Sequence, residues 1–175
     1  MVEKFLYFAY GSNLLSHRIH INNPSAVRRG IGKLNDYRLS FVTYSKRWGG
    51  CSATIVPKQS SVVWGAVWEL DNCHRESLDR QEGVDKNIYI PISVQIELPE
   101  GGLTLCRSYR QTADPVDDAL ENLPLDFRPS EPYLKTIIKG AEESGLPSDY
   151  LDFLKTIPHN GYHGPVDVQM PLYYH

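Results

Sequence analysis

The sequence predicts an α+β fold in which a mainly antiparallel, barrel-like β-sheet is flanked by helices. Strand-like segments fill the first two-thirds of the 175-residue chain, and helix-like segments fill the last third. Residues 88–98 alternate apolar and polar side chains, as a strand with one buried face does. Residues 62–70 are apolar on both faces, as expected of a central strand.

The predicted strands are short runs rich in aromatic and β-branched residues, separated by turns. Gly11 ends the first run, and Glu100-Gly101-Gly102 forms a hairpin turn before the last one. In the alternating run, Ile90 shares a face with the other aliphatic residues, and Tyr89 lies on the opposite face. The strands cover residues 5–10, 34–44, 53–56, 62–70, 88–98 and 103–109.

Each predicted helix begins at a residue that can cap its first turn. Ser12 or Asn13 caps the first helix, Asp71 caps the second, and Ser130 caps the third. Gly83 is placed to end the second helix. The helices cover about residues 14–21, 72–82 and 130–144, with a last one from 148 to a stop before Pro158.

The chain is expected to form one domain. Residues 111–129 are acidic and interrupted by prolines, which predicts a surface excursion. Residues 161–175 are rich in Gly, Pro and Tyr and are expected to form a C-terminal tail. Residues 1–160 then make up the single domain, a size that can bury a real core.

Composition argues against several classes of partner. The net charge is −3 and no basic stripe is visible, so neither nucleic acid nor an acidic membrane surface is an expected partner. The cysteines Cys51, Cys73 and Cys106 are odd in number and widely spaced, which disfavours structural zinc and a disulfide framework. The sequence shows no signal-peptide pattern and no long apolar run, so a cytoplasmic protein is expected.

The loop at residues 10–13 is the first candidate site. A strand that breaks at Gly11 and re-enters as a helix at Asn13 leaves the first N–H groups of that helix without internal partners. Such groups favour a substrate carboxylate, or the oxyanion that forms during acyl transfer. The loop has neither a P-loop ending nor the Gly-x-Ser-x-Gly pattern of a hydrolase elbow. By itself, this pattern is also that of an ordinary capped helix.

Glu82 is the second candidate, because it is the last residue before Gly83 at a helix end. The negative end of the helix dipole, the nearby charge of Asp79 and burial in an apolar pocket would all raise its pKa. A carboxyl group tuned in this way can accept and return a proton near neutral pH. The alternative is a solvated surface glutamate with an ordinary pKa.

The run Tyr7-Phe8-Ala9-Tyr10-Gly11-Ser12-Asn13-Leu14 resembles the signature of the γ-glutamylcyclotransferase family. Further stretches resemble the family in the same order along the chain. These are Asn23-Pro24-Ser25-Ala26, Val63-Trp64-Gly65, the region from Leu78 to Val84, Cys106-Arg107-Ser108-Tyr109, Gly140-Ala141 and Gly145-Leu146-Pro147. Each fragment alone is weak evidence, but the ordered set is specific.

The resemblance implies a γ-glutamylcyclotransferase-like catalytic domain with no metal or organic cofactor, in a cytoplasmic protein that is often a homodimer. It assigns the role of general acid and base to Glu82. It assigns substrate binding to the loop and to several tyrosines, namely Tyr7, Phe8, Ala9, Tyr10, Gly11, Ser12, Asn13, Tyr89, Tyr109 and Tyr133. The substrate would be a γ-glutamyl amino acid, which is cyclised to 5-oxoproline with release of the amino acid.

Other readings stay open from the sequence. A relative in the same class could act on glutathione or on γ-glutamylamines. A catalytically silent relative could bind a small molecule or a protein, although the carboxylate at Glu82 argues against that reading. A hydrolase that deacylates γ-glutamyl conjugates without closing a ring is a weaker third possibility.

Overall fold

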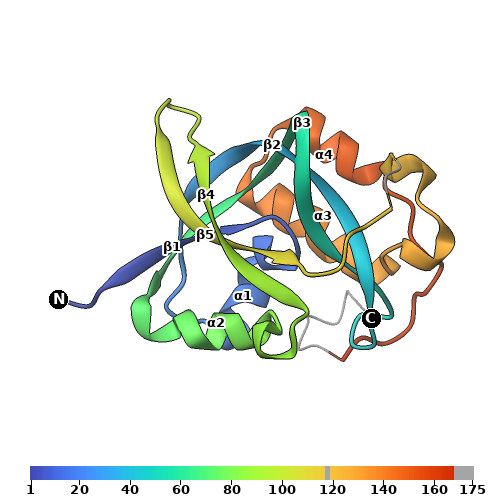
Figure 1. Ribbon diagram of the computed structural model, residues 1–175, viewed down its shortest axis with the longest axis horizontal. Coiled ribbons are helices and arrows are strands. Elements are labelled where there is room, and N and C mark those ends of the chain that lie inside the picture. Colours follow the sequence, from blue (N-terminus) through green and yellow to red (C-terminus); the bar gives the residue numbers. More distant parts are fainter. Residues whose placement is uncertain (117–118, 168–175) are drawn as a thin grey trace.

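The computed structural model describes residues 1–116 and 119–167. Five strands form a closed barrel in the order β1-β3-β2-β4-β5, and all neighbouring pairs are antiparallel except β1 and β5 (Figure 1). The strands are β1 (Lys4–Ala9), β2 (Val27–Ser45), β3 (Gly50–Asp71), β4 (Tyr89–Glu97) and β5 (Leu103–Gln111). The predicted mainly antiparallel, barrel-like sheet is therefore confirmed.

The β2–β3 hairpin is longer than the pattern of apolar residues suggested, because the pattern breaks where the backbone pairing continues. The ladder shifts register between Asn35 and Tyr37. Between them, Asp36 has a positive φ of 64°, and its carboxylate accepts a hydrogen bond of 3.0 Å from the Ser60 backbone N–H. This irregularity lies beside the exposed residues 57–60 and explains why β3 was predicted as two separate strands.

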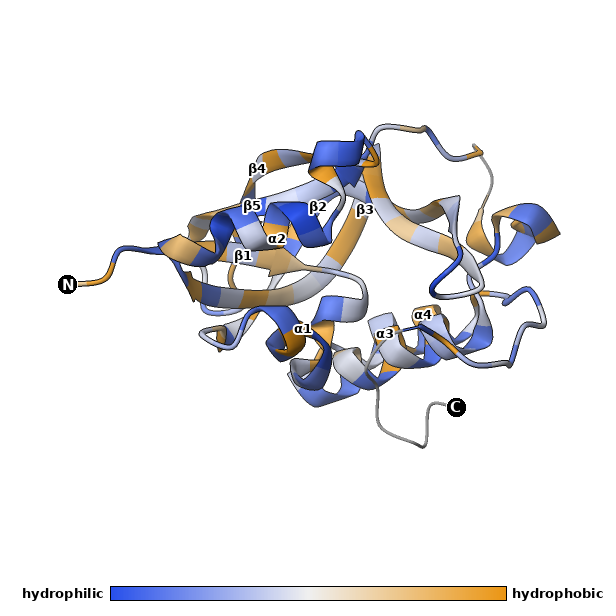
Figure 2. Ribbon diagram, turned by 90° about the horizontal axis from the view of Figure 1, so that it is seen from below, coloured by the Kyte–Doolittle hydropathy of each residue, from blue (hydrophilic) through white to orange (hydrophobic). Residues whose placement is uncertain are grey.

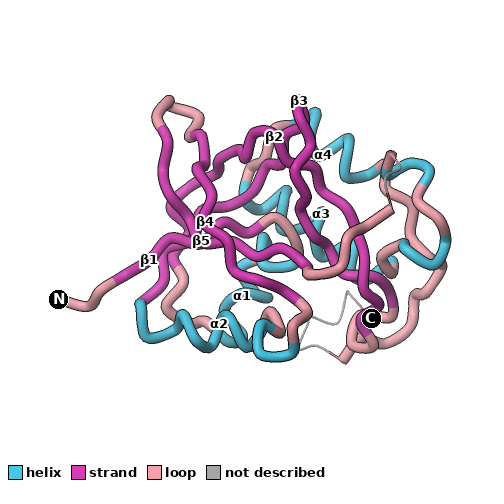
Figure 3. The backbone as a smooth tube through the Cα atoms, viewed as in Figure 1, coloured by secondary structure: helices cyan, strands magenta, loops and turns pink. Residues whose placement is uncertain are grey.

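Two short pairings close the barrel. Tyr7 of β1 lies opposite Arg107 of β5 in the parallel pair, and Lys33 of β2 lies opposite Glu97 of β4. Most of the second edge of β4 is thus left unpaired, so Pro91, which has no N–H to donate, is accommodated within the strand. The β4–β5 hairpin projects from the barrel at the upper left of Figure 3.

The alternation predicted for β4 does not describe burial at its beginning. Tyr89, on the face predicted to be polar, is only 8% exposed, whereas Ile90, on the face predicted to be apolar, is 44% exposed. Farther along the strand, Val94 on the apolar face is 5% exposed, as predicted. The Tyr89 hydroxyl donates a hydrogen bond of 2.5 Å to the carbonyl oxygen of Ala53. Because its polar end is satisfied inside the protein, Tyr89 can be buried on a face that the pattern assigned to polar residues.

Helices cover the barrel, with α1, α3 and α4 together on the side away from β4 (Figure 2). The α-helices are α1 (Ser16–Asn22), α2 (Arg75–Gln81), α3 (Glu131–Ser144) and α4 (Ser148–Lys155). Shorter 3-10 turns are η1 (Ser12–Leu14), η2 (Asn72–His74), η3 (Val84–Lys86), η4 (Leu120–Asn122) and η5 (Leu125–Phe127). Within the described residues, no helix combines the length and apolar character needed to cross a membrane.

One of the predicted helix caps is present and two are wrong. The Ser130 hydroxyl accepts a hydrogen bond of 3.3 Å from the Tyr133 N–H at the start of α3, as predicted. Neither Ser12 nor Asn13 caps a helix through its side chain, and Asp71 does not either. In both places the chain enters its α-helix through a 3-10 turn, so the predicted capping geometry does not arise.

The predicted surface excursion at 111–129 is wrong for part of its length. Leu120 is 6% exposed and Leu123 is fully buried, because η4 packs them into the hydrophobic core. Residues 117 and 118, within this segment, lie outside the described residues.

Residues 159–167 brace the turn between β2 and β3. The Asn160 side-chain amide donates a hydrogen bond of 2.8 Å to the Gly49 carbonyl oxygen, and the Tyr162 ring packs against the same glycine. The Asp167 N–H donates to the Arg47 carbonyl oxygen at 2.9 Å. Of the predicted tail, residues 168–175 lie outside the described residues, and the division at residue 160 stays a prediction.

Gly140 sets the distance between α3 and the chain that follows β1. A Cβ atom at this position would lie 2.5 Å from the Leu15 backbone nitrogen and 2.6 Å from the Leu14 Cβ. Both distances are below any real contact, so only glycine lets the helix approach this closely. The contact holds η1, and with it residues 11–13, against α3.

We predict that Gly140→Ala lowers the free energy of unfolding by about 1–3 kcal/mol, because overpacking forces α3 away from η1. Alanine is the better helix former, so a net loss of stability would come from the contact alone. Urea unfolding of the variant and of the wild type measures the difference. Glu142→Ala, on the exposed side of the same helix, is the control and should change stability by less than about 0.5 kcal/mol. Unchanged or increased stability of the glycine variant would contradict this account.

Candidate active site

Glu82 stands where α2 ends. Its backbone N–H donates to the Leu78 carbonyl oxygen at 3.0 Å, which completes the last turn of the helix. The next residue, Gly83, has a φ of 73° and turns the chain away, as the sequence predicted. The Glu82 side chain is thereby left at the wall of a cavity instead of continuing a helix face.

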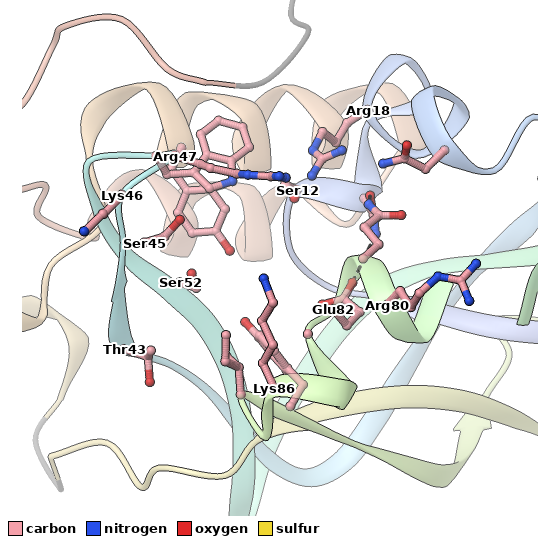
Figure 4. A pocket seen from close by; sticks show the side chains of 18 of the residues that line it. Ser12, Arg18, Thr43, Ser45, Lys46, Arg47, Ser52, Arg80, Glu82 and Lys86 are labelled. Atoms are coloured by element: carbon pink, nitrogen blue, oxygen red, sulfur yellow. Dashed lines mark hydrogen bonds between the residues drawn. The ribbon is translucent and has the colours of Figure 1, made fainter. Parts of the chain in front are cut away.

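The cavity has a wide outer part and a narrow inner part. The outer part has a volume of about 750 Å³ and receives Glu82 and Lys86 from the α2 side and Ser45 and Arg47 from the β2 side (Figure 4). The inner part is a small hollow of about 40 Å³. The residues that line both parts are Ser12, Asn13, Glu82, Tyr89 and Tyr133. Glu82 therefore lies at the junction between them.

The loop after β1 forms one wall of the inner cavity. Gly11, Ser12 and Asn13 line it, and none of their backbone N–H groups has an acceptor among the described residues. A Cβ atom at Gly11 would lie 3.6 Å from the Tyr133 hydroxyl and 3.6 Å from the Ala53 Cβ, so glycine leaves this side of the cavity open. The expected cluster of unpaired donors is present, although it begins a 3-10 turn.

Five tyrosines line the inner cavity, and the hydroxyl of each has one partner or more, that of Tyr109 being Asp79. Tyr10 donates to the Tyr109 carbonyl oxygen at 2.7 Å, and Tyr89 donates to Ala53. Tyr133 instead accepts from the Ala53 N–H at 2.9 Å, and Tyr7 accepts from the Asn13 amide at 3.1 Å. Because a hydroxyl also carries a hydrogen, the last two can still donate toward the cavity.

The structure brings together most of the residues predicted for the site. Besides Glu82, these are Tyr7, Tyr10, Gly11, Ser12, Asn13, Tyr89, Tyr109 and Tyr133, all of which line the inner cavity. Phe8 and Ala9 are placed elsewhere: both are fully buried in the core and line neither part of the cavity. Their burial follows from the barrel, because these β1 residues pair with Val67 and Ala66 of β3.

The environment of Glu82 raises the pKa of its carboxyl group to about 7. Burial is the largest cause, and the negative charge of Asp79 acts in the same direction. The positive charge of Arg18 and the Tyr7 hydroxyl oppose the rise. The Asn13 amide also donates to a Glu82 carboxylate oxygen at 3.3 Å, which favours the ionised form. Near neutral pH, both protonation states of this group are therefore populated.

A chain of amides orients Asn13. The Asn23 side chain, which is fully buried, donates to the side-chain oxygen Oε1 of Gln81 at 2.8 Å. The Gln81 amide nitrogen in turn donates to the Asn13 side-chain oxygen at 3.4 Å. Because that oxygen is occupied, the NH₂ group of Asn13 is the end that faces Tyr7 and Glu82. Sequence reasoning missed this chain, since it joins residues from three separate segments.

Two charged features of the site were also missed. Arg107 of β5 holds Asp79 of α2 with contacts of 2.8 and 3.0 Å, and the Tyr109 hydroxyl bonds to the same carboxylate. Arg18 of α1 is only 8% exposed and lies near enough to Glu82 to influence it. In the sequence, Arg18 is one polar residue among several in a short helix, and nothing marks it as buried.

The described residues contain no cluster of side chains suited to bind a metal ion. Across 1–116 and 119–167, no three His, Cys, Asp or Glu side chains gather closely enough to hold a metal ion.

Comparison with known proteins identifies the family. The model of the AIG2-like family matches residues 62–154. The proteins named gamma-glutamylcyclotransferase from Bos taurus and Mus musculus are each 42% identical over 172 residues, covering 96% of this chain and 86% of the relative. This chain belongs to the γ-glutamylcyclotransferase family.

The solved structures agree with that assignment. A structure titled "Gamma-glutamyl cyclotransferase" superposes with a TM-score of 0.85 at 42% identity and covers 94% of both chains. The region matched by the family model contains Glu82 and Tyr133, and the longer match to the γ-glutamylcyclotransferase relatives extends over nearly the whole chain. The resemblance drawn from short motifs is thus confirmed over the chain as a whole.

We predict that Glu82 makes the folded protein less stable as the pH rises. Its pKa is about 7 in the folded state against an ordinary value of 4.5, so the folded protein holds a proton that the unfolded chain has lost. The loss of folding stability caused by Glu82 is absent below pH 4.5 and complete above about pH 7. Relative to the wild type, Glu82→Gln should therefore gain stability between pH 5 and pH 8, by at most about 3 kcal/mol.

Urea unfolding at both pH values measures this gain. The control is Glu76→Gln, also on α2, where the side chain is 90% exposed and the difference from the wild type should stay constant. If the wild type and Glu82→Gln showed parallel pH dependence, Glu82 would not have the raised pKa.

Proposed function

We propose that this chain is a γ-glutamylcyclotransferase that cyclises the γ-glutamyl group of γ-glutamyl amino acids to 5-oxoproline and releases the free amino acid. The observation that carries this proposal is the Glu82 carboxyl group, with a pKa of about 7, at the wall of the inner cavity. Such a group exchanges protons readily at neutral pH. The names of the relatives from Bos taurus and Mus musculus support the same reaction.

The loop after β1 is proposed to bind the γ-glutamyl group. The unpaired N–H groups of Gly11, Ser12 and Asn13 suit either the α-carboxylate or the oxygen of the scissile carbonyl. Preorganised donors of this kind stabilise the oxyanion that forms when the carbonyl is attacked. Tyr133 can add a further hydrogen bond, because its hydroxyl accepts from Ala53 and keeps its own hydrogen.

Glu82 is proposed to move the protons. Its carboxylate takes one proton from the α-ammonium of the substrate, and the freed amine attacks the γ-carbonyl carbon to form a C–N bond. The tetrahedral intermediate then breaks the original amide C–N bond. Glu82 returns its proton to the departing nitrogen, and the second proton gained by that nitrogen is the one that the ring nitrogen loses.

This reaction needs few groups because the nucleophile and the electrophile belong to one molecule. Well-oriented intramolecular reactions reach effective molarities of about 10⁵–10⁸ M. The enzyme has to fold the substrate into its reactive conformer and exclude water, and the loop and tyrosines that line the inner cavity, beside the wider outer part, are placed for that task. One acid and a few N–H groups then suffice.

We predict that Glu82→Gln lowers kcat for γ-glutamyl-alanine by about 10²–10⁴-fold, because glutamine keeps the shape but carries no exchangeable carboxyl proton. Release of 5-oxoproline, measured by chromatography, reports the activity. Glu76→Gln is again the matched control and should keep normal turnover. Near-normal turnover of a folded Glu82→Gln protein would remove Glu82 from the mechanism.

We predict that kcat/KM rises with pH through about 7 and then levels off, since Glu82 has to be ionised to accept the first proton. Asp79→Asn should shift this rise to lower pH. It removes the negative charge that raises the Glu82 pKa and frees the positive charge of Arg107. A pH profile that Asp79→Asn leaves unmoved would argue that another group controls the rate.

The same assay separates the other reactions. Formation of 5-oxoproline from glutathione or from a γ-glutamylamine at a higher rate would change the substrate class. Release of free glutamate would indicate a hydrolase, and binding without product would indicate a silent relative.

A cytoplasmic location and a homodimer are also proposed. All three cysteines, Cys51, Cys73 and Cys106, are free thiols, which fits a reducing compartment. Light scattering of the purified protein measures the oligomeric state.

A further inference from the structure

The outer cavity is strongly basic in a protein whose net charge is −3. Five cationic side chains line it, and the acidic Glu82 is the one carboxylate among its described lining residues. The cations are Arg18, Lys46, Arg47, Arg80 and Lys86. Low-dielectric walls that carry one sign of charge concentrate ligands of the opposite sign.

Arg18 is the most unusual of these cations, because its guanidinium is buried with no described carboxylate within ion-pair distance, although the charge of Glu82 acts on it from farther away. The residue is 8% exposed, and its Nε has no hydrogen-bond partner. It forms no ion pair with any carboxylate in the described part of the chain. Burying a cation in this way is costly unless something pairs with it. An anionic ligand in the cavity would supply the partner.

A second guanidinium approaches Arg18 from across the cavity. Figure 4 shows the Arg47 side chain extending from the β2–β3 turn toward Arg18, with Ser12 beside them. The two are close enough for the charge of Arg47 to lower the pKa of Arg18. Both cations line one cavity and neither forms an ion pair with a described carboxylate, so an anion with two oxygen atoms would be attracted to both guanidiniums.

We propose that Arg18 and Arg47 bind the carboxylate of the leaving amino acid and so select γ-glutamyl conjugates whose amine carries that group. This inference rests on the proposed function. Both arginines line the outer part of the cavity and neither lines the inner part. With the γ-glutamyl group against the loop in the inner part, the leaving group lies on their side of Glu82.

Binding at this position also orients the reaction. In an amino acid, the carboxylate is one carbon away from the nitrogen that leaves. Fixing the carboxylate between two guanidiniums therefore fixes the departing nitrogen next to Glu82, from which it receives its proton. Interaction with both ends of the conjugate restricts it to the folded conformer that can cyclise.

The first test compares γ-glutamyl-alanine with γ-glutamyl-alaninamide, in which a neutral carboxamide replaces the carboxylate of the leaving group. With the wild type, we expect kcat/KM for 5-oxoproline release to be about ten- to a hundredfold lower for the amide, the loss typical of charged hydrogen bonds. Equal values for the two substrates would overturn the proposed carboxylate site and leave the cyclisation itself intact. If neither substrate gave 5-oxoproline, the proposed function would fail first.

The second test uses Arg47→Gln, a change on an exposed side chain that should not disturb folding. It should lower kcat/KM for γ-glutamyl-alanine and leave the value for the amide nearly unchanged, so that the ratio between the substrates collapses. Arg47→Glu should reverse the preference. Arg29→Gln, on the exposed part of β2 and outside the cavity, should keep the wild-type ratio.

Arg18→Gln should reduce the same ratio. This variant also changes the charge near Glu82, but that change affects both substrates alike. The ratio of their kcat/KM values therefore reports the binding of the carboxylate. A wild-type ratio in Arg47→Gln would overturn the proposal whether or not the Arg18 variant folds.

Discussion

Glu82 holds its carboxyl group at the cavity wall where α2 ends, and the rest of the site is arranged around that half-buried acid. Burial alone would hold the group in its protonated form, which cannot accept a proton. The Arg18 charge, the Tyr7 hydroxyl and the Asn13 amide favour ionisation and bring the pKa back to about 7. The balance between these opposing effects gives the group both of its states at neutral pH.

The closure of the barrel and the position of the acid depend on the same residue. Arg107 lies opposite Tyr7 in the short parallel pairing of β5 with β1. Its guanidinium also holds Asp79, one turn before Glu82 on α2. Strand closure therefore fixes the end of α2 relative to the loop that follows β1. A carboxyl group and a row of N–H groups from distant parts of the sequence come to face the same hollow.

The fold class could be predicted from local signals in the sequence, whereas the role of Glu82 was predicted from the resemblance to the family's motifs, since its place at a helix end also suited a surface glutamate. Alternation and turn glycines mark the strands, and Glu82 before Gly83 marks the acid at a helix end. The 3-10 entries into α1 and α2 could not be predicted, since Ser12, Asn13 and Asp71 all suit ordinary capping. Burial of Leu123 likewise depends on which surface lies beneath its segment.

The ion pairs and pKa shifts of the site were harder to predict than the residues that form it. Asp79 was expected to repel charge on Glu82, and it does, but its own pairing with Arg107 depends on a strand that comes later in the chain. The burial of Arg18 and the relay from Asn23 through Gln81 depend on how α1 and α2 pack together. The local sequence shows which charged residues are present, and only their tertiary contacts determine their ion pairs and pKa shifts.

Residues 159–167 support the β2–β3 turn, which presents Arg47 to the outer part of the cavity. The turn that presents Arg47 is supported by Asn160 and Asp167, whereas Glu82 is held at the end of α2 and the loop at residues 11–13 packs against α3. The Glu131 N–H at the start of α3 also donates to the Tyr162 carbonyl oxygen at 3.1 Å, so the same segment ties the Arg47 turn to that helix. A change in residues 159–167 is therefore expected to alter the entrance of the cavity first, because the turn that presents Arg47 rests directly on them.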